Sequence, residues 1–349
     1  MRLLTPLLLI ATAWAGPSPA AANGPRTADG HPDFSGMYDI ATLTPLVRPA
    51  NVGGRKSLTD EEAKVLAKAD AARKAERNDK SDPNRQAPPA GGDGSEGASG
   101  NVGGYNTLWI DNGNGAFKVD GQWRTSILID PPDGKMPKMT PEAAKRAGER
   151  ARLNRPNRGD AWWIPEGVSP GPYDDPELRP AAERCLMGFG SSSGPPAMPV
   201  LYNNLKQIVQ TKDTVLILNE MVHDARVVRM NAKHDPPEIR RWLGDSIGTW
   251  EGDTLVVDST NFNGAPALAG ASGNLHVVER FSRMDDKTLL YRFTVEDPSV
   301  WTAPWTGEFV WPATESRIFE YACHEGNYSF GNILRGARLL EGEAAKSAK

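Results

Sequence analysis

Two segments of the chain place a histidine beside several other groups that can transfer protons. The first is EMVHDAR at 220–226, in which His223 precedes Asp224 and follows Glu220 by three residues. An imidazole oriented by a carboxylate is suited to general acid or base catalysis. If the preceding strand continued unbent, however, Glu220 and Asp224 would share one face and His223 would point to the other. The simpler interpretation is a histidine at a strand end that donates to a backbone carbonyl.

The second segment, YACHEGNY at 321–328, gathers His324, Glu325 and Tyr328 just after Cys323. It follows a predicted strand and runs into a glycine turn, and a rigid loop of this kind positions catalytic groups well. We therefore expect His324 and Glu325 to assist His223 in catalysis, and Tyr328 to contact a bound ligand.

The other three histidines are weaker candidates. His276 lies on a predicted strand, on the face opposite Glu279, and is expected to contact a ligand. Its alternative role is to pair with a carboxylate across the strands. His31 and His234 stand in loops beside prolines, so we expect both at the surface.

No metal or other cofactor is expected. Zinc could be bound by His223, His276 and His324 from separate strands, but no two of them have the close spacing of common ligand pairs. The run GFGSSSG at 188–194 lacks the pattern of a phosphate-binding loop, and the sequence has no Gly-x-Ser-x-Gly elbow.

The chain has ten tryptophans, and four of them stand in two groups, Trp162 with Trp163 and Trp301 with Trp305. Their flat apolar faces could form a wall on which a cyclic, aromatic or sugar-like ligand stacks. The alternative is that these side chains anchor the core and the long loops. We expect ligand contacts from all four.

The elements that must position these residues are mostly strands. From residue 105 onward, short segments rich in β-branched and aromatic residues recur between turn signals. In one of them, Leu289, Tyr291, Phe293 and Val295 share one face, as in a half-buried strand. The pattern predicts a mainly β fold, an antiparallel barrel or sandwich with long loops and one or two peripheral helices. The predicted strands cover 108–111, 122–129, 206–211, 214–219, 226–230, 239–243, 248–250, 254–258, 275–283, 288–296, 306–311 and 317–323.

Two helices are predicted beside the strands. One covers 58–77, where Thr59 and Glu62 can form a capping box. The other covers 140–152, where Thr140 can cap a helix that begins at Pro141. Residues 78–104 are of low complexity and are expected to be a loop or a linker. The chain is thus divided into an irregular N-terminal segment at 23–104, whose packing is left open, a β domain at 105–340 with long loops at 154–200, and a tail at 341–349.

The beginning of the sequence predicts export. Residues 1–22 combine Arg2, a short apolar stretch and two small-residue cleavage sites, the pattern of a secretory signal peptide. We expect a periplasmic or secreted protein with no membrane span after cleavage. Because free thiols oxidise in such a compartment, Cys185 and Cys323 are expected to form a disulfide, with two buried thiols as the alternative. The net charge of −4 and the absence of a basic stripe argue against nucleic acid as a partner.

Seven motifs, taken together, resemble a family of exported and largely uncharacterised bacterial proteins. They are PPDG at 131–134, ERC at 183–185, YNN at 202–204, EMVHDAR at 220–226, GTWEGDT at 248–254, HVVER at 276–280 and ACHEGN at 322–327. The resemblance covers about residues 105–338 and implies no particular catalytic residues. The hairpin at 250–257 is similar to hairpins in lipocalin-like β-barrels, which implies a fold of that kind.

These observations support an enzyme first. It would be a hydrolase, lyase or isomerase that uses His223 as general acid or base on a cyclic, aromatic or sugar-like small molecule. The alternative is a non-catalytic, lipocalin-like protein that binds an apolar or aromatic small molecule. A third possibility is an interaction module of the cell envelope, which predicts an exposed apolar patch. The sequence leaves the oligomeric state open.

Overall fold

The computed structural model describes residues 24–77, 84, 110–155 and 159–347. The expected signal peptide at 1–22 and nearly all of the low-complexity segment at 78–104 lie outside the described residues. Within the described residues the fold is mainly β, as the sequence predicts.

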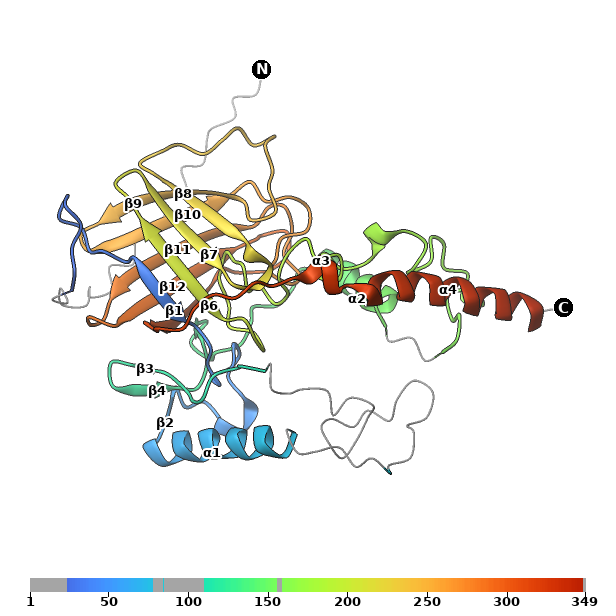
Figure 1. The fold of residues 1–349 in the computed structure, drawn as a ribbon, viewed down its shortest axis with the longest axis horizontal. Helices are drawn as coiled ribbons and strands as arrows, with labels where there is room; N and C mark the ends of the chain where they lie inside the picture. The colour runs from blue at the N-terminus through green and yellow to red at the C-terminus, as the bar shows by residue number, and fades with distance from the viewer. Residues whose placement is uncertain (1–23, 78–83, 85–109, 156–158, 348–349) are drawn as a thin grey trace, which may run out of the picture.

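A curled sheet of ten strands forms the body of the molecule, in the order β1-β6-β7-β8-β9-β10-β11-β12-β13-β5 (Figure 1). All neighbouring strands are antiparallel except β8 and β9, which are parallel. The sheet curls so far that Tyr38 of β1 forms an antiparallel bridge with Ala313, just after β13. The strands are β1 (Gly36–Asp39), β5 (Leu128–Asp130), β6 (Leu205–Gln210), β7 (Thr214–Asn219), β8 (Ala225–Met230), β9 (Asp245–Glu251), β10 (Thr254–Thr260), β11 (His276–Arg283), β12 (Thr288–Glu296) and β13 (Trp305–Pro312).

The inner face of this sheet is filled by large side chains. On β12, Leu289, Tyr291, Phe293 and Val295 are at most 1% exposed, which confirms the predicted alternation. The ring of Tyr291 lies 4.9 to 5.5 Å, between centroids, from four other aromatic rings on β11, β12 and β13. Burying each side chain of this size stabilises the fold by roughly 1.5–3 kcal/mol. The middle of the curled sheet is therefore a packed core.

A smaller sheet, in the order β2-β4-β3, supports the first helix. Its strands are β2 (Ser57–Leu58), β3 (Lys118–Val119) and β4 (Gln122–Arg124). Helix α1 (Asp60–Arg77) begins with the predicted capping box, because the Glu62 backbone N–H donates to Thr59 Oγ1 at 3.2 Å and the Thr59 N–H donates to Glu62 Oε2 at 2.8 Å. Helix α2 (Pro141–Leu153) begins at the predicted cap, where the Ala143 N–H donates to Thr140 Oγ1 at 3.2 Å.

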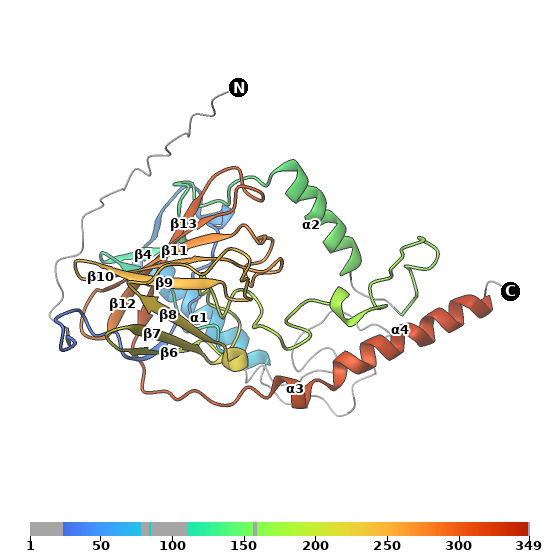
Figure 2. The same ribbon diagram turned by 90° about the horizontal axis from the view of Figure 1, so that it is seen from above.

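An arm projects from the body of the molecule (Figures 1 and 2). It contains the one-turn helix α3 (Cys323–Gly326), helix α4 (Tyr328–Ser347) and part of the irregular segment after residue 158. Ala337 of α4 packs against Trp162, Trp163 and Tyr173 in a small separate core. The predicted disulfide between Cys185 and Cys323 is present, with 5.8 Å between the Cα atoms. None of the helices in the described part of the chain is both long and apolar enough to cross a membrane.

Several sequence predictions differ from the structure. The strand predicted at 317–323 is wrong, because residues 314–322 are irregular and Phe319 is 72% exposed, so its alternation has no surface to pack on. The strand predicted at 239–243 is also irregular, apart from one bridge between Arg241 and Phe262. The strand predicted at 122–129 is divided between β4 and β5, which belong to different sheets. The expected tail at 341–349 begins inside α4.

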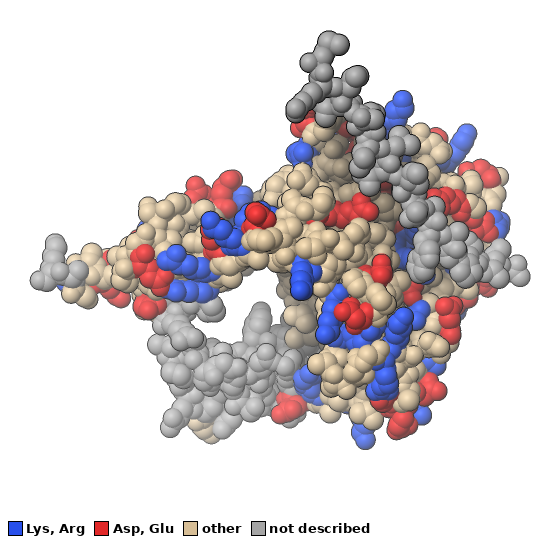
Figure 3. Space-filling view, turned by 180° about the vertical axis from the view of Figure 1, so that it is seen from behind, with Lys and Arg blue, Asp and Glu red and all other residues tan. Residues whose placement is uncertain are grey.

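Three 3₁₀ turns complete the described elements, at Ala50–Val52, Pro176–Leu178 and Met221–His223. The segment from 159 to 204 contains no other helix or strand, as the predicted long loop region requires. On the face drawn in Figure 3, Lys and Arg side chains lie beside Asp and Glu side chains, in keeping with the small net charge of −4.

Candidate functional site

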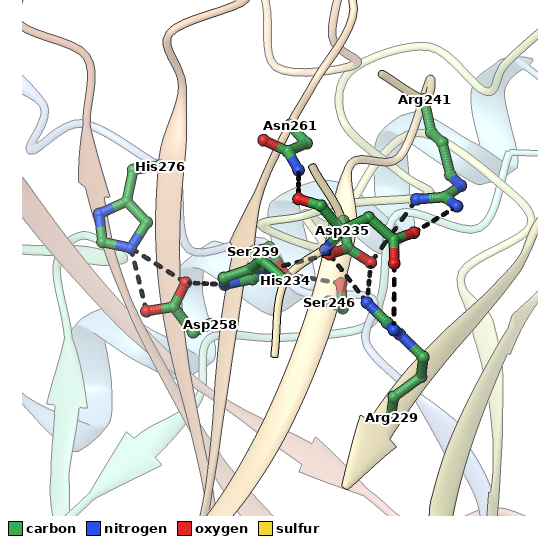
Figure 4. A network of polar contacts seen from close by, with 10 residues as sticks. Arg229, His234, Asp235, Arg241, Ser246, Asp258, Ser259, Asn261 and His276 are labelled. Atoms are coloured by element: carbon green, nitrogen blue, oxygen red, sulfur yellow. Dashed lines mark hydrogen bonds and ion pairs between the residues drawn. The ribbon is translucent and has the colours of Figure 1, made fainter. Parts of the chain in front are cut away.

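A connected group of titratable side chains, partly open to solvent, lies on the outer face of the sheet and is centred on Asp258 of β10 (Figure 4). His276 Nε2, from the first residue of β11, lies 3.2 Å from Asp258 Oδ1 and 3.1 Å from Oδ2. His234 Nε2 lies 3.0 Å from the same Oδ1. One carboxylate thus joins two imidazoles.

The fold brings these residues together through the parallel pair β8 and β9. Because the two strands run in the same direction, the segment 231–244 between them must return along the length of the sheet. This return places His234 against Asp258. In the register of β10 and β11, Asp258 pairs with Val278, so His276 is two residues away along β11 on the same face.

The far side of His234 is held by a buried carboxylate. His234 Nδ1 lies 3.0 Å from Oδ2 of Asp245, whose side chain is 5% exposed. Asp245 also accepts hydrogen bonds from Arg229 at 2.8 and 3.0 Å and from the backbone N–H of Asp235 at 2.8 Å. Arg241 donates to the Asp235 carboxylate at 2.6 Å. The position of His234 is therefore set by Asp245, whose carboxylate is itself held by Arg229 and by the Asp235 backbone.

The far side of His276 is held more loosely. Its Nδ1 lies 3.4 Å from Glu296 Oε2, and the Glu296 side chain is 50% exposed. A contact of this length is at the outer limit of a hydrogen bond. Of the four imidazole nitrogens in the network, His276 Nδ1 is therefore the one most able to exchange its partner for another molecule.

The electrostatics of the network favour charged forms. Burial raises the pKa of Asp258, but the hydrogen bonds from His276 and His234 outweigh burial and leave this pKa below its usual value. The hydrogen bond to Asp258 raises the pKa of His276, burial opposes it, and Glu296 adds to the increase. His276 thus keeps its proton to a higher pH than a free imidazole does, because the ion pair with Asp258 is lost on deprotonation.

The residues predicted from EMVHDAR point in two directions. Val222 and His223 have positive φ values of 60° and 52°, so the chain bends there. His223 is exposed, and its Nε2 accepts a hydrogen bond from the Tyr321 N–H at 3.1 Å. Glu220 is 5% exposed, and Asp224 accepts a hydrogen bond from the Ser193 hydroxyl on the interior side. The bend that the sequence argument required is present, but it separates His223 from the two carboxylates.

The other predicted site residues are either exposed or fully packed. His324 and Glu325 lie exposed on α3, and Tyr328 is 79% exposed at the start of α4. Trp301 and Trp305 are 5% and 0% exposed in the main core, where their rings meet edge to face. Trp162 and Trp163 are buried in the core of the arm, and Trp163 donates to Glu341 at 2.8 Å. Their roles in catalysis or ligand binding stay predictions.

Sequence reasoning found His276 but missed its partners. His234 was expected to be a surface residue with no role in a site, and Asp258 and Asp245 were not predicted as site residues. Only the pairing of the strands brings these three residues together. His276 and His223, two of the three histidines weighed as zinc ligands, contact different partners, and His324 lies exposed on α3. Across the described residues, no three His, Cys, Asp or Glu side chains are arranged to hold a metal ion.

No protein-family model, curated protein or solved structure matches this chain.

Proposed function

We propose that the protein is an exported enzyme of the hydrolase, lyase or isomerase type, and that His276 is its general acid or base. The observation that carries the proposal is the pair of unequal contacts of His276, with Asp258 at 3.1 Å on Nε2 and the exposed Glu296 at 3.4 Å on Nδ1. A positioned imidazole with one fixed and one exchangeable nitrogen is the arrangement that general acid–base catalysis uses.

Each residue of the network has a defined part in this chemistry. Asp258 accepts the Nε2–H of His276, which leaves the lone pair of the neutral ring on Nδ1. Nδ1 then removes a proton from the substrate, and the protonated ring is stabilised by Asp258 and Glu296. Because the pKa of His276 is raised, the ring is also able to return that proton as a general acid near neutral pH.

His234 is a positioning residue in this proposal. It holds the second side of Asp258, and Asp245 holds His234 in turn. The two ring nitrogens of His234 thus lie between two carboxylates. Such a ring keeps the Asp258 carboxylate fixed toward His276.

The substrate class remains the one that the sequence suggested, a cyclic, aromatic or sugar-like small molecule. Export is supported by the N-terminal sequence pattern and by the disulfide, which fits an oxidising compartment such as the periplasm or the exterior. The resemblance to exported bacterial proteins is part of the same proposal.

The test is an activity screen with glycosides and aromatic esters, followed by variants of the network. We expect His276→Gln to lower kcat/KM by a factor of about 10²–10⁴, the usual contribution of a general acid or base. His31→Gln is the matched control, because His31 stacks on Trp250 at 4.4 Å and is not part of the network. Loss of activity in His223→Gln with full activity in His276→Gln would move the site to the EMVHDAR segment. Binding of the panel compounds without turnover would favour the lipocalin-like alternative.

A further inference from the structure

Lys206 of β6 is the most unusual side chain in the interior, because it is a lysine with no exposed surface. It lies in register with Asn219 of β7, and both side chains face the inside of the curled sheet. Residues 188–197, which we call the serine loop, cover this end of the interior. Lys206 Nζ donates to the backbone carbonyl of Ser192 in that loop at 2.5 Å.

The serine loop occupies this end much as a ligand would. It presents the Ser193 carbonyl to Asn219 Nδ2 at 3.3 Å and the Ser193 hydroxyl to Asp224 at 2.5 Å. The Ala197 N–H donates to the hydroxyl of Tyr291 at 3.0 Å. The loop is also packed into the interior, because residues 191–198 are buried, Ala197 belongs to the main hydrophobic core, and the Ser192 hydroxyl contacts Met221 Sδ at 3.2 Å.

Charged side chains from three neighbouring strands and turns surround Lys206. Arg226 of β8 forms a buried ion pair with Glu279 of β11, Glu220 directly follows β7, and Asp224 directly precedes β8. Burial lowers the pKa of Lys206 to about 7, although Glu220 and Asp224 act in the opposite direction. An amine in this state is available as a nucleophile near neutral pH, whereas a surface lysine is almost fully protonated.

Two polar atoms beside Lys206 lack a hydrogen-bond partner. They are Asn219 Oδ1, which can accept, and Arg226 Nε, which can donate. Asn219 and Arg226 are 0% and 3% exposed, and buried polar atoms in folded proteins are nearly always paired. A hydroxyl group is both a donor and an acceptor, so the hydroxyl of a small ligand offers a partner to either atom.

We propose that Lys206 forms an imine with a small hydroxy-aldehyde or hydroxy-ketone that enters when the serine loop moves aside. The neutral amine attacks the carbonyl carbon, a new carbon–nitrogen bond forms, and the carbinolamine loses water to give the imine. The two hydrogens of that water come from the amine and its oxygen comes from the carbonyl. Asp224, whose pKa is raised by burial and whose charge acts on Lys206, supplies and recovers the proton that the leaving hydroxyl needs. This site is separate from the His276 network, so either proposal can fail alone.

The test is reductive trapping on the intact protein, with glycolaldehyde or acetaldehyde and cyanoborohydride, followed by peptide mass spectrometry. Acetaldehyde is the matched probe, because it differs from glycolaldehyde only in lacking the hydroxyl. The exposed Lys212 in the β6–β7 turn is the internal reference. We expect glycolaldehyde to alkylate Lys206 at least fivefold faster than Lys212 at pH 7, and acetaldehyde to show less preference for Lys206.

The pH dependence provides a second readout. The rate at Lys206 should level off just above pH 7, because its amine is already largely neutral there, whereas the rate at an ordinary surface lysine keeps rising about tenfold per pH unit. Lys206→Met should remove the mark at that position and leave Lys212 unchanged. An unmodified Lys206 in protein whose surface lysines are fully alkylated would overturn the proposal. Equal rates with the two aldehydes would overturn the assignment of the hydroxyl site.

Discussion

Replacing Lys206 with methionine should stabilise the protein, and the gain should depend on pH. The side chain is fully buried, and burial is the main cause of its lowered pKa. Methionine has a similar length and flexibility and carries no charge, so it removes the cost of burying an ammonium group. The same substitution loses one hydrogen bond to the Ser192 carbonyl, worth about 1 kcal/mol.

The size of the effect follows from the two pKa values. Lys206 has a pKa of about 7 in the folded protein and an ordinary value of 10.5 when unfolded. The unfolded chain binds more protons between these values, so the stability of the wild-type protein rises as the pH increases through this range. The cost of Lys206 is about 5 kcal/mol at pH 6 and falls to about 2 kcal/mol at pH 9.

Denaturant unfolding at pH 6 and pH 9 measures this difference. We expect the stability gap between Lys206→Met and wild type to narrow by about 3 kcal/mol from pH 6 to pH 9. Lys212→Met is the matched control, because Lys212 is exposed and its removal should leave the pH dependence as it is in the wild type. A gap that is the same at both pH values would refute the argument, since it would mean that Lys206 has its ordinary pKa in the folded state.

Three further predictions concern other parts of the molecule. NMR titration of His276 should give a pKa above the ordinary value of an imidazole. Asp258→Asn should lower this pKa more than Glu296→Gln does, because Asp258 is the larger cause of the shift. A wild-type pKa at or below the ordinary value would contradict the network. Replacing both Cys185 and Cys323 with serine should lower the free energy of unfolding by roughly 4–5 kcal/mol, since the bridge closes a loop across 138 residues. An unchanged melting temperature under oxidising conditions would show that the bridge does not constrain the unfolded chain. Thr59→Ala should cost about 1 kcal/mol in thermal unfolding, because it removes one half of the α1 capping box, whereas the exposed Val65→Ala should change little.

The sequence predicts the sheet well where a strand has one buried face. The alternation along β12 is visible in the sequence because its inward residues are large and apolar and its outward residues, except Leu290, are polar. The same pattern misleads at 317–323, where Phe319 and Tyr321 alternate with Glu320 and Ala322 but the segment pairs with no strand. Period-2 alternation shows that a segment could form a strand with one buried face. Whether it does so depends on whether the fold places a neighbouring strand and a core beside it.

Helix α4 was not predicted, and the reason is local. Glycines at 331, 336 and 342 lower its intrinsic helix propensity, and each costs about 1 kcal/mol relative to alanine. The helix is supported instead by Ala337, which packs against the two tryptophans of the arm. Those contacts join segments about 170 residues apart, beyond the reach of any local pattern.

The candidate site was only half predictable for a related reason. His276 and Asp258 are on strands that the sequence identifies, and their shared face follows once β10 and β11 are paired. His234 is on a connection between parallel strands, and a sequence of otherwise antiparallel hairpins offers no sign of that one exception. The buried Lys206 is hidden for the opposite reason, since a lysine in a strand is normally taken to face water.

The disulfide closes residues 185–323, which carry most strands of the large sheet, into a covalent ring. The bond between Cys185 and Cys323 encloses strands β6 to β13, Lys206 and the whole His276 network, while β1, β5 and α4 lie on the two chain ends outside it. A protease that cuts once inside the ring opens it without releasing a fragment, so the nicked molecule keeps all of its strands in one covalent piece. A cut outside the ring separates an end from it. The residues of both proposed sites therefore lie in the part of the chain that a single proteolytic cut cannot detach.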